Sequence, residues 1–199
     1  VEVIFNYGSF GKNTEWNKIN DAIIDSIHSV KWPRGSNNFT IFPECGKKRG
    51  KGNGVKPIKN NFMKTMHNKY GWKLEDRSID IATVKKTGPI DATKEVNGKH
   101  FAVEWETGNI SSSHRSINKM LLGMLKGKLV GGAVIVPSQK ITPFLTDRVG
   151  NYPELSTYFE LWKSFKIEEG ILCIYIFEHD KESWDVPRIP KGTDGRSIV

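Results

Sequence analysis

The feature that most constrains the fold is the dipeptide Asn97-Gly98, which separates two runs of residues with strand-like alternation. Asn-Gly between such runs indicates a β-hairpin closed by a two-residue type I′ turn. This turn would fix the register of the hairpin, because the two residue numbers of every opposed pair then have the same sum. On that register Asp91 faces Glu104. The sequence therefore predicts one strand over 90–96 and its partner over 99–107.

Three carboxylates would meet on one face of this hairpin. Directly opposed residues have Cβ atoms about 5 Å apart, and Glu106, two residues beyond Glu104, points to the same face. Like charges this close destabilise a hairpin. A bound Mg²⁺ would compensate, since it prefers oxygen ligands, and the backbone carbonyl of Trp105 could be one more ligand. The alternative is a solvated strand face in which the acids pair with Lys94.

A fourth acid could join this group from the upstream segment. Glu75 and Asp76 are both candidates, and their spacing does not choose between them.

A helix of about 112–127 follows the carboxylates directly, and its N-terminus should lie beside them. Helix N-termini attract phosphate groups. The residues there include side chains that can bond base edges in a DNA groove, with Asn suited to adenine and Arg to guanine. They are Asn109, Ser111, Ser112, His114 and Arg115. The alternative for the serines is helix capping alone.

The remaining pattern predicts alternating helices and strands. Asn13 or Thr14 would cap a first helix and Pro57 would open a second, with a last helix over about 153–165. Further strands are expected over 78–84, 130–136 and 171–177. The order α α β β β α β α β favours a mixed α/β protein with a five-stranded sheet flanked by helices on both faces. We expect one domain over 1–199, with 187–199 as an extended C-terminal arm.

The positive charge of the chain is unevenly distributed. The formal net charge is +8. Between Gly46 and Lys73 there is no acidic residue, and the glycines of 46–54 predict a loop. The basic residues of this stretch are Lys47, Lys48, Arg49, Lys51, Lys56, Lys59, Lys64, Lys69 and Lys73. Such a stretch attracts a phosphate backbone, although a merely solubilising surface is the alternative.

Several functional classes are disfavoured. There is no apolar run long enough to span a membrane and no secretory signal, and two cysteines fit a reducing compartment. We therefore expect a cytoplasmic protein without a membrane partner. No Walker-type loop is present, so a nucleotide cofactor is not expected. The five histidines form no ligand pairs at helical spacing, which disfavours a zinc enzyme.

The chain resembles a known nuclease family over most of its length. The segment Gly88-Pro-Ile-Asp91, followed by Val103-Glu-Trp-Glu-Thr-Gly-Asn-Ile-Ser-Ser-Ser-His-Arg-Ser-Ile-Asn-Lys119, is similar to the catalytic segment of the BamHI-type restriction endonucleases. Shorter similar strings include Leu145-Thr-Asp-Arg-Val149 and Val186-Pro-Arg-Ile-Pro-Lys-Gly-Thr-Asp-Gly195. The resemblance implies a restriction-endonuclease-like core of the PD-(D/E)xK class, with Glu106 where that class usually has Lys.

The resemblance also implies roles for individual residues. Asp91 and Glu104 would hold one or two Mg²⁺ ions, and Glu106 would be the general base. The bases would be read in the major groove by Asn109, Ser111, Ser112, Arg115, Asp147 and Arg148. Lys59 would contact DNA near the site entrance, and Thr193, Asp194 and Gly195 would form an arm in the minor groove.

The expected activity is that of a bacterial type II site-specific deoxyribonuclease. The family acts as a homodimer on double-stranded DNA at a palindrome, GGATCC for BamHI itself, and leaves 5′-phosphate and 3′-hydroxyl ends. The helices over 112–127 and 153–165 are the expected dimer interface. Two alternatives remain: a DNA-binding protein without activity, and a metal-dependent phosphoryl-transfer enzyme acting on small molecules.

Overall fold

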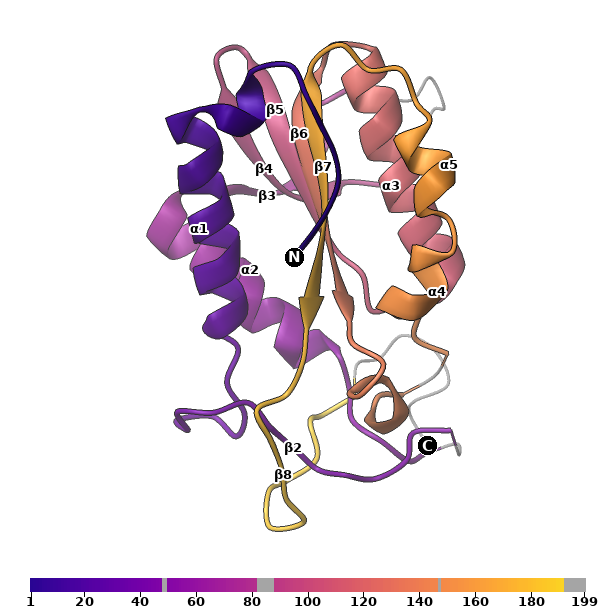
Figure 1. The fold of residues 1–199 in the computed structure, drawn as a ribbon. Coiled ribbons are helices and arrows are strands. Elements are labelled where there is room, and N and C mark those ends of the chain that lie inside the picture. The colour runs from indigo at the N-terminus through magenta and orange to yellow at the C-terminus, as the bar shows by residue number, and fades with distance from the viewer. Residues whose placement is uncertain (48–49, 82–87, 147, 192–199) are drawn as a thin grey trace.

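The computed structural model describes residues 1–47, 50–81, 88–146 and 148–191 (Figure 1). Its main feature is a mixed sheet of six strands in the order β1-β7-β6-β5-β4-β3. The strands are β1 (Glu2–Tyr7), β3 (Lys73–Asp76), β4 (Ile90–Val96), β5 (Lys99–Trp105), β6 (Leu129–Pro137) and β7 (Gly170–Phe177). The central strands β5, β6 and β7 are parallel, and the outer pairs are antiparallel. The predicted mixed sheet is confirmed, with six strands instead of five.

Helices cover both faces of this sheet (Figure 1). One face carries α1 (Thr14–His28) and α2 (Lys56–Tyr70), and the other carries α3 (Ile110–Leu125), α4 (Tyr152–Ser156) and α5 (Phe159–Lys163). Short pieces complete the described chain: β2 (Thr40–Ile41) pairs with β8 (Lys181–Glu182), and single 3₁₀ turns cover Phe10–Lys12 and Thr142–Phe144.

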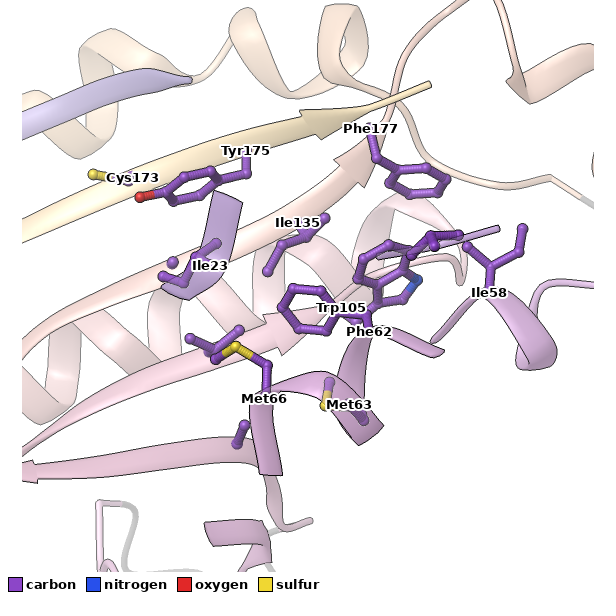
Figure 2. Packing of buried hydrophobic residues seen from close by; sticks show 14 of the residues in the cluster. Ile23, Ile58, Phe62, Met63, Met66, Trp105, Ile135, Cys173, Tyr175 and Phe177 are labelled. Carbon is purple, nitrogen blue, oxygen red and sulfur yellow. The ribbon is translucent and has the colours of Figure 1, made fainter. Parts of the chain in front are cut away.

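Each helical layer has its own apolar core against the sheet. On the α1–α2 side the sheet residues Trp105, Ile135 and Tyr175 pack with Ile23 and Phe62 of the helices (Figure 2). The α3–α5 side has a second cluster, to which α3 and α5 contribute through residues such as Ile117, Leu121 and Trp162. Both faces are apolar because a central parallel sheet is covered on both sides.

The helix starts follow the capping rules. Asn13 accepts a hydrogen bond from the Trp16 amide at the start of α1, and Pro57 lies in the first turn of α2. Asn109 caps α3 by accepting from the Ser112 amide, so this helix begins two residues earlier than expected.

Two predicted elements differ in the structure. Residues 78–81 form no strand, and 82–84 lie outside the described residues. The strand that pairs with β4 is instead β3, at Lys73–Asp76. The helix expected over 153–165 is divided into α4 and α5 by a turn at Thr157 and Tyr158.

No helix in the described ranges is long and apolar enough to cross a membrane.

Candidate active site

The site is built on the β4–β5 hairpin, whose register is the predicted one. Val96 pairs with Lys99 and Ala92 with Val103, and both turn residues have positive φ, 50° at Asn97 and 77° at Gly98. These angles are those of a type I′ turn. The register leads directly to Asp91 and Glu104 at the other end of the hairpin.

Asp91 and Glu104 lie against each other across the two strands. The Asp91 amide approaches Glu104 Oε2 at 3.4 Å, and the Trp105 amide donates to Asp91 Oδ2 at 2.8 Å. The Trp105 indole packs on the opposite face, with ring centroids 4.5 Å from Phe177 and 4.9 Å from Phe62. A large buried ring between the two glutamates therefore anchors the strand end that carries them.

Glu106 lies just beyond β5 and is held by both neighbouring elements. Its amide donates to the Ile135 carbonyl of β6 at 2.8 Å, and Ser116 of α3 donates its hydroxyl to Glu106 Oε1 at 2.5 Å. Burial raises the pKa of Glu106, the Ser116 hydrogen bond opposes this rise, and the charge of Asp91 adds to it. Glu106 is thus a largely buried carboxylate with a raised proton affinity.

Two lysines neutralise the other carboxylates, one from each helical layer. Lys59 of α2 contacts Asp91 Oδ1 at 2.5 Å, and Lys119 of α3 contacts Glu104 Oε1. Lys119 also donates to the Pro89 carbonyl at 3.3 Å. Burial raises the pKa of Glu104 to about 7, with a further contribution from Asp91 that Lys119 counteracts. The cluster is therefore compensated by ammonium groups.

These residues line one open cleft of about 790 Å³. The lining combines the three carboxylates with residues of α2, α3 and the segment before β4: Lys59, Glu75, Gly88, Pro89, Asp91, Glu104, Trp105, Glu106, Ser112, Arg115, Ser116, Asn118, Lys119 and Leu122. The cleft brings together most of the catalytic residues predicted from the sequence.

The donor set of this cleft fits a hard divalent cation. Carboxylate oxygens are the ligands that Mg²⁺ prefers, usually one or two of them together with water. In the described part of the chain, no group of three or more Asp, Glu, His or Cys side chains is arranged so that it could hold a metal ion. Lysine ammonium groups instead provide the positive charge beside Asp91 and Glu104.

The structure places Glu75 and Asp76, the two candidates for the fourth acid, in different surroundings. Glu75 is exposed, has a positive φ of 50° and lines the carboxylate cleft. Asp76 is buried and accepts hydrogen bonds from Thr93 at 2.7 Å and from the Ser78 amide and hydroxyl. Burial disfavours the Asp76 carboxylate, but its bonds with Lys73, Ser78 and Thr93 outweigh burial and hold its pKa well below the usual range. Of the two acids, Glu75 is thus the one at the cleft.

The residues predicted to read DNA bases divide between two hollows. Ser112 and Arg115 line the carboxylate cleft. Asn109, Ser111 and Arg148 line a neighbouring hollow of about 670 Å³ at the start of α3. The start of α3 therefore lies between the carboxylate cleft and a hollow in which Asn109, Ser111 and Arg148 stand beside apolar residues.

Some predicted residues cannot be placed. Asp147, Thr193, Asp194 and Gly195 lie outside the described residues.

Two residues of the site were not singled out by the sequence argument. Ser116 and Lys119 bond Glu106 and Glu104. A signal for them existed, because Ser112, Ser116 and Lys119 follow one another at four- and three-residue spacing and so share one face of α3. That face is the one that turns toward the carboxylates.

The chain is similar to known restriction enzymes over most of its length. A family model described as restriction endonuclease BamHI matches residues 1–196. The type II restriction enzyme OkrAI of Oceanobacter kriegii is 49% identical over 199 residues, which is 100% of this chain and 97% of that enzyme. The type II restriction enzyme BamHI of Bacillus amyloliquefaciens is 41% identical over 179 residues, covering 86% of this chain and 79% of BamHI.

Among solved structures, restriction endonuclease BglII in complex with a DNA 16-mer matches with a TM-score of 0.49 and 11% identity. The match covers 81% of this chain and 70% of that one.

The family match over nearly the whole chain, together with two restriction enzymes at 49% and 41% identity, establishes an enzyme of the type II restriction endonuclease class. The chain therefore belongs to the BamHI family of restriction endonucleases.

Proposed function

We propose that this protein is a homodimeric deoxyribonuclease that cleaves double-stranded DNA at the palindrome GGATCC in a reaction that depends on Mg²⁺. It would act in the bacterial cytoplasm as part of a restriction system. The observation that carries the proposal is the meeting of Asp91, Glu104 and Glu106 in one cleft beside the N-terminus of α3.

The residues of the cleft have separable tasks in phosphodiester hydrolysis. Asp91 and Glu104, with the Trp105 carbonyl, would hold the cation, which when bound supplies positive charge to the phosphoryl oxygens. Glu106 takes a proton from the attacking water. The water oxygen forms a bond to phosphorus, the bond to the 3′-oxygen breaks, and that oxygen takes a proton from solvent. The products are a 5′-phosphate and a 3′-hydroxyl.

The surface around α3 supports recognition of DNA bases. Asn109, Ser111, Ser112, Arg115 and Arg148 offer donors and acceptors in two adjoining hollows. We assign Asp147 to the same task and Thr193-Asp194-Gly195 to a minor-groove arm, within a single domain over 1–199. The GGATCC specificity follows from the resemblance of these residues to those of BamHI.

An apolar surface on α3 and α5 supports the homodimer. Leu122 and Leu125 of α3 are exposed, as are Tyr158 and Leu161. The two elements lie side by side, because the His114 ring of α3 is 4.4 Å from Tyr158 and 5.4 Å from Trp162. A two-fold pair of such surfaces would place one active site on each strand of a palindrome.

The test is digestion of a plasmid that carries several GGATCC sequences, with Mg²⁺, with Ca²⁺ or with EDTA. Discrete fragments that end at GGATCC in Mg²⁺ alone are expected. Fragments that end at another palindrome would keep the chemistry and overturn the proposed specificity. Tight site-specific binding without cleavage in Mg²⁺ would overturn the catalytic assignment.

A further inference from the structure

A separate cleft, which is positively charged, lies on the outer side of α2, away from the carboxylates. It is open, has a volume of about 840 Å³ and runs between α2 and the segment 29–36 that follows α1. The side chains of Lys31, Arg34, Lys64 and Lys69 line it, and no Asp or Glu does. Neither the nuclease chemistry nor the base-reading surface accounts for this cleft.

Three of these cations are not paired with a carboxylate within the described ranges. Among the residues that the structure describes, Lys31, Arg34 and Lys64 form no ion pair and no side-chain hydrogen bond, whereas Lys69 pairs with Asp25 at 3.0 Å. Pairing is common for the other lysines of the basic stretch: Lys51 contacts Glu44, Lys59 contacts Asp91 and Lys73 contacts Asp76. Lys64 shares its lack of an ion pair with Lys47 and Lys56 of that stretch among the described residues, but it alone of these three lines the cleft, where it joins two cations from another part of the chain.

The walls of the cleft are held in place by bonds of their own. Asn61 donates to the Lys31 carbonyl at 3.3 Å, and Thr65 donates to the Ser29 hydroxyl at 2.8 Å. These contacts connect α2 to the segment 29–36. Asn60 and Asn68 also line the cleft, and both are exposed, so neutral donors accompany the three cations.

The position of the cleft connects it with the active site. Lys59 on the inner side of α2 contacts Asp91, and the next residue, Asn60, already belongs to the outer cleft. An α-helix rises 1.5 Å per residue, so Lys64 lies about 7.5 Å further along the axis than Lys59. DNA carries one phosphate per 3.4 Å of axis on each strand, so a strand that runs along α2 would have about two phosphates in this interval.

We infer that this cleft binds the phosphate backbone of the DNA that flanks the recognition sequence. The inference rests on the proposed function. Arg34 and Lys64 are exposed, Lys31 is half-buried, and the cleft is open, which suits several solvated phosphates in a row better than one tightly held small anion. Binding would come from the release of condensed counterions and would add affinity without reading sequence.

The experiment compares two duplexes in EDTA, where no cleavage is expected. One ends close to the GGATCC sequence, and the other carries about one helical turn of flank on each side. The variant Lys31→Gln, Arg34→Gln, Lys64→Gln should bind the long duplex as weakly as the unchanged protein binds the short one. The slope of log K against log salt on the long duplex should fall by about one for each phosphate that the variant no longer neutralises.

A matched variant controls for net charge. Lys99, Lys128 and Lys166 are exposed and have no ion pair in the described structure. They lie near the opposite end of the sheet, where β5, β6 and β7 begin. Changing all three to Gln removes the same charge, and the preference for the long duplex should remain.

The outcomes separate the inference from the function on which it rests. If the unchanged protein binds neither duplex, the proposed function fails. If it binds both, and the cleft variant keeps the full preference for the long one, the inference is overturned. An equally weakened affinity in the cleft variant and the control variant would also overturn it, because net charge alone would then explain the effect.

A second measurement needs no variant. Acetylation of surface lysines in the unchanged protein can be followed by mass spectrometry with each duplex. Lys31 and Lys64 should be protected by the long duplex and not by the short one, while Lys99 and Lys128 react equally in both. Equal reactivity of Lys31 and Lys64 with both duplexes would contradict the inference, whatever the folding of the variants.

Discussion

At the residue scale, the two neighbouring acids of β3, Glu75 and Asp76, should have different roles, one in catalysis and the other in the stability of the fold. Asp76 is buried in a hydrogen-bonded setting, and Glu75 lines the carboxylate cleft. Glu75→Gln should slow Mg²⁺-dependent cleavage about tenfold or more and leave the unfolding free energy unchanged. Asp76→Asn should lower the unfolding free energy by about 1–3 kcal/mol. Urea unfolding and cleavage rates measured on both variants test this assignment, and exchanged effects would refute it.

The effect of Asp76→Asn should also depend on pH. The pKa of Asp76 is lowered in the folded protein, so its stabilising effect is present above the pKa of the unfolded chain. That effect is lost as the pH falls toward the folded value. The difference in stability between Asp76→Asn and the unchanged protein should therefore be full at neutral pH and shrink in acid.

If Glu106 is the general base that we propose, Ser116 should set the pH range in which it acts. Its hydroxyl bonds the carboxylate and lowers a pKa that burial has raised. Ser116→Ala should raise the pKa further and shift the acidic limb of the cleavage rate by about one unit to higher pH. Rates at high pH should change little, since Glu106 is then ionised in both proteins. The readout is a pH profile of single-turnover cleavage.

Ser113 provides the control for that experiment. It lies on the same helix, and its buried hydroxyl has no hydrogen-bond partner in the described structure. Ser113→Ala should leave the acidic limb in place. An unshifted limb in Ser116→Ala would contradict the role given to Glu106.

At the element scale, the hairpin turn determines which carboxylates meet. Gly98 has a φ of 77°, and a Cβ atom placed there would meet no atom within 4 Å. Gly98→Ala should therefore cost only the left-handed backbone strain, about 1–2 kcal/mol of unfolding free energy. Asn97→Gly should be tolerated, because Gly-Gly also forms a type I′ turn. Denaturant unfolding measures both, and a Gly98→Ala protein of full stability would contradict the turn type.

The β4–β5 hairpin was predictable from the sequence, whereas strands β1 and β3 were not. Asn-Gly between alternating runs specifies a register by local geometry alone. In β1 a register shift between Val3 and Phe5 leaves the successive residues Ile4 and Phe5 both buried, so the alternation that marks a strand is lost. Strand β3 has the sequence Lys-Leu-Glu-Asp and depends on pairing with β4, which its composition does not reveal.

The division of the last helical region has a local cause that sequence periodicity conceals. The hydroxyls of Ser156 and Thr157 donate to the carbonyls of Pro153 and Glu154, and the Tyr158 amide bonds the Leu155 carbonyl three residues back. Hydroxyl groups that bond nearby carbonyls compete with the regular helix pattern. The apolar spacing continues through this turn, so it predicted one helix where there are two.

The sequence predicted those parts of the site whose geometry depends on residues close together in the chain. Asp91, Glu104 and Glu106 follow from one turn and the two-residue period of a strand. Lys59 and Lys119 reach the same carboxylates from helices on opposite faces of the sheet. Their meeting depends on the tertiary packing of three layers, which no spacing within the sequence specifies.

At the scale of the whole molecule, the apolar surface of α3 and α5 should control assembly. Leu125 and Leu161 are 51% and 57% exposed. Replacing both with Glu should give a folded monomer that no longer cuts both strands in one binding event, because charged groups are unfavourable at the core of an interface. Sedimentation equilibrium and the ratio of nicked to linear plasmid are the measurements.

Trp184 is a suitable control, since it is 66% exposed and lies elsewhere on the surface. Trp184→Glu should leave the dimer intact. A dimer that persists in the double variant would place the interface on another surface.

The pairing of Lys59 with Asp91 and of Lys119 with Glu104 has a consequence for the life of the chain before it meets its cofactor. Many small metalloproteins remain unfolded until an ion binds, because the free energy of metal binding supplies the free energy of folding. Here two lysines, one from each helical layer, already pair with these carboxylates. We therefore expect a newly synthesised molecule to fold in a cell poor in free cations and to cleave DNA only after a cation is supplied.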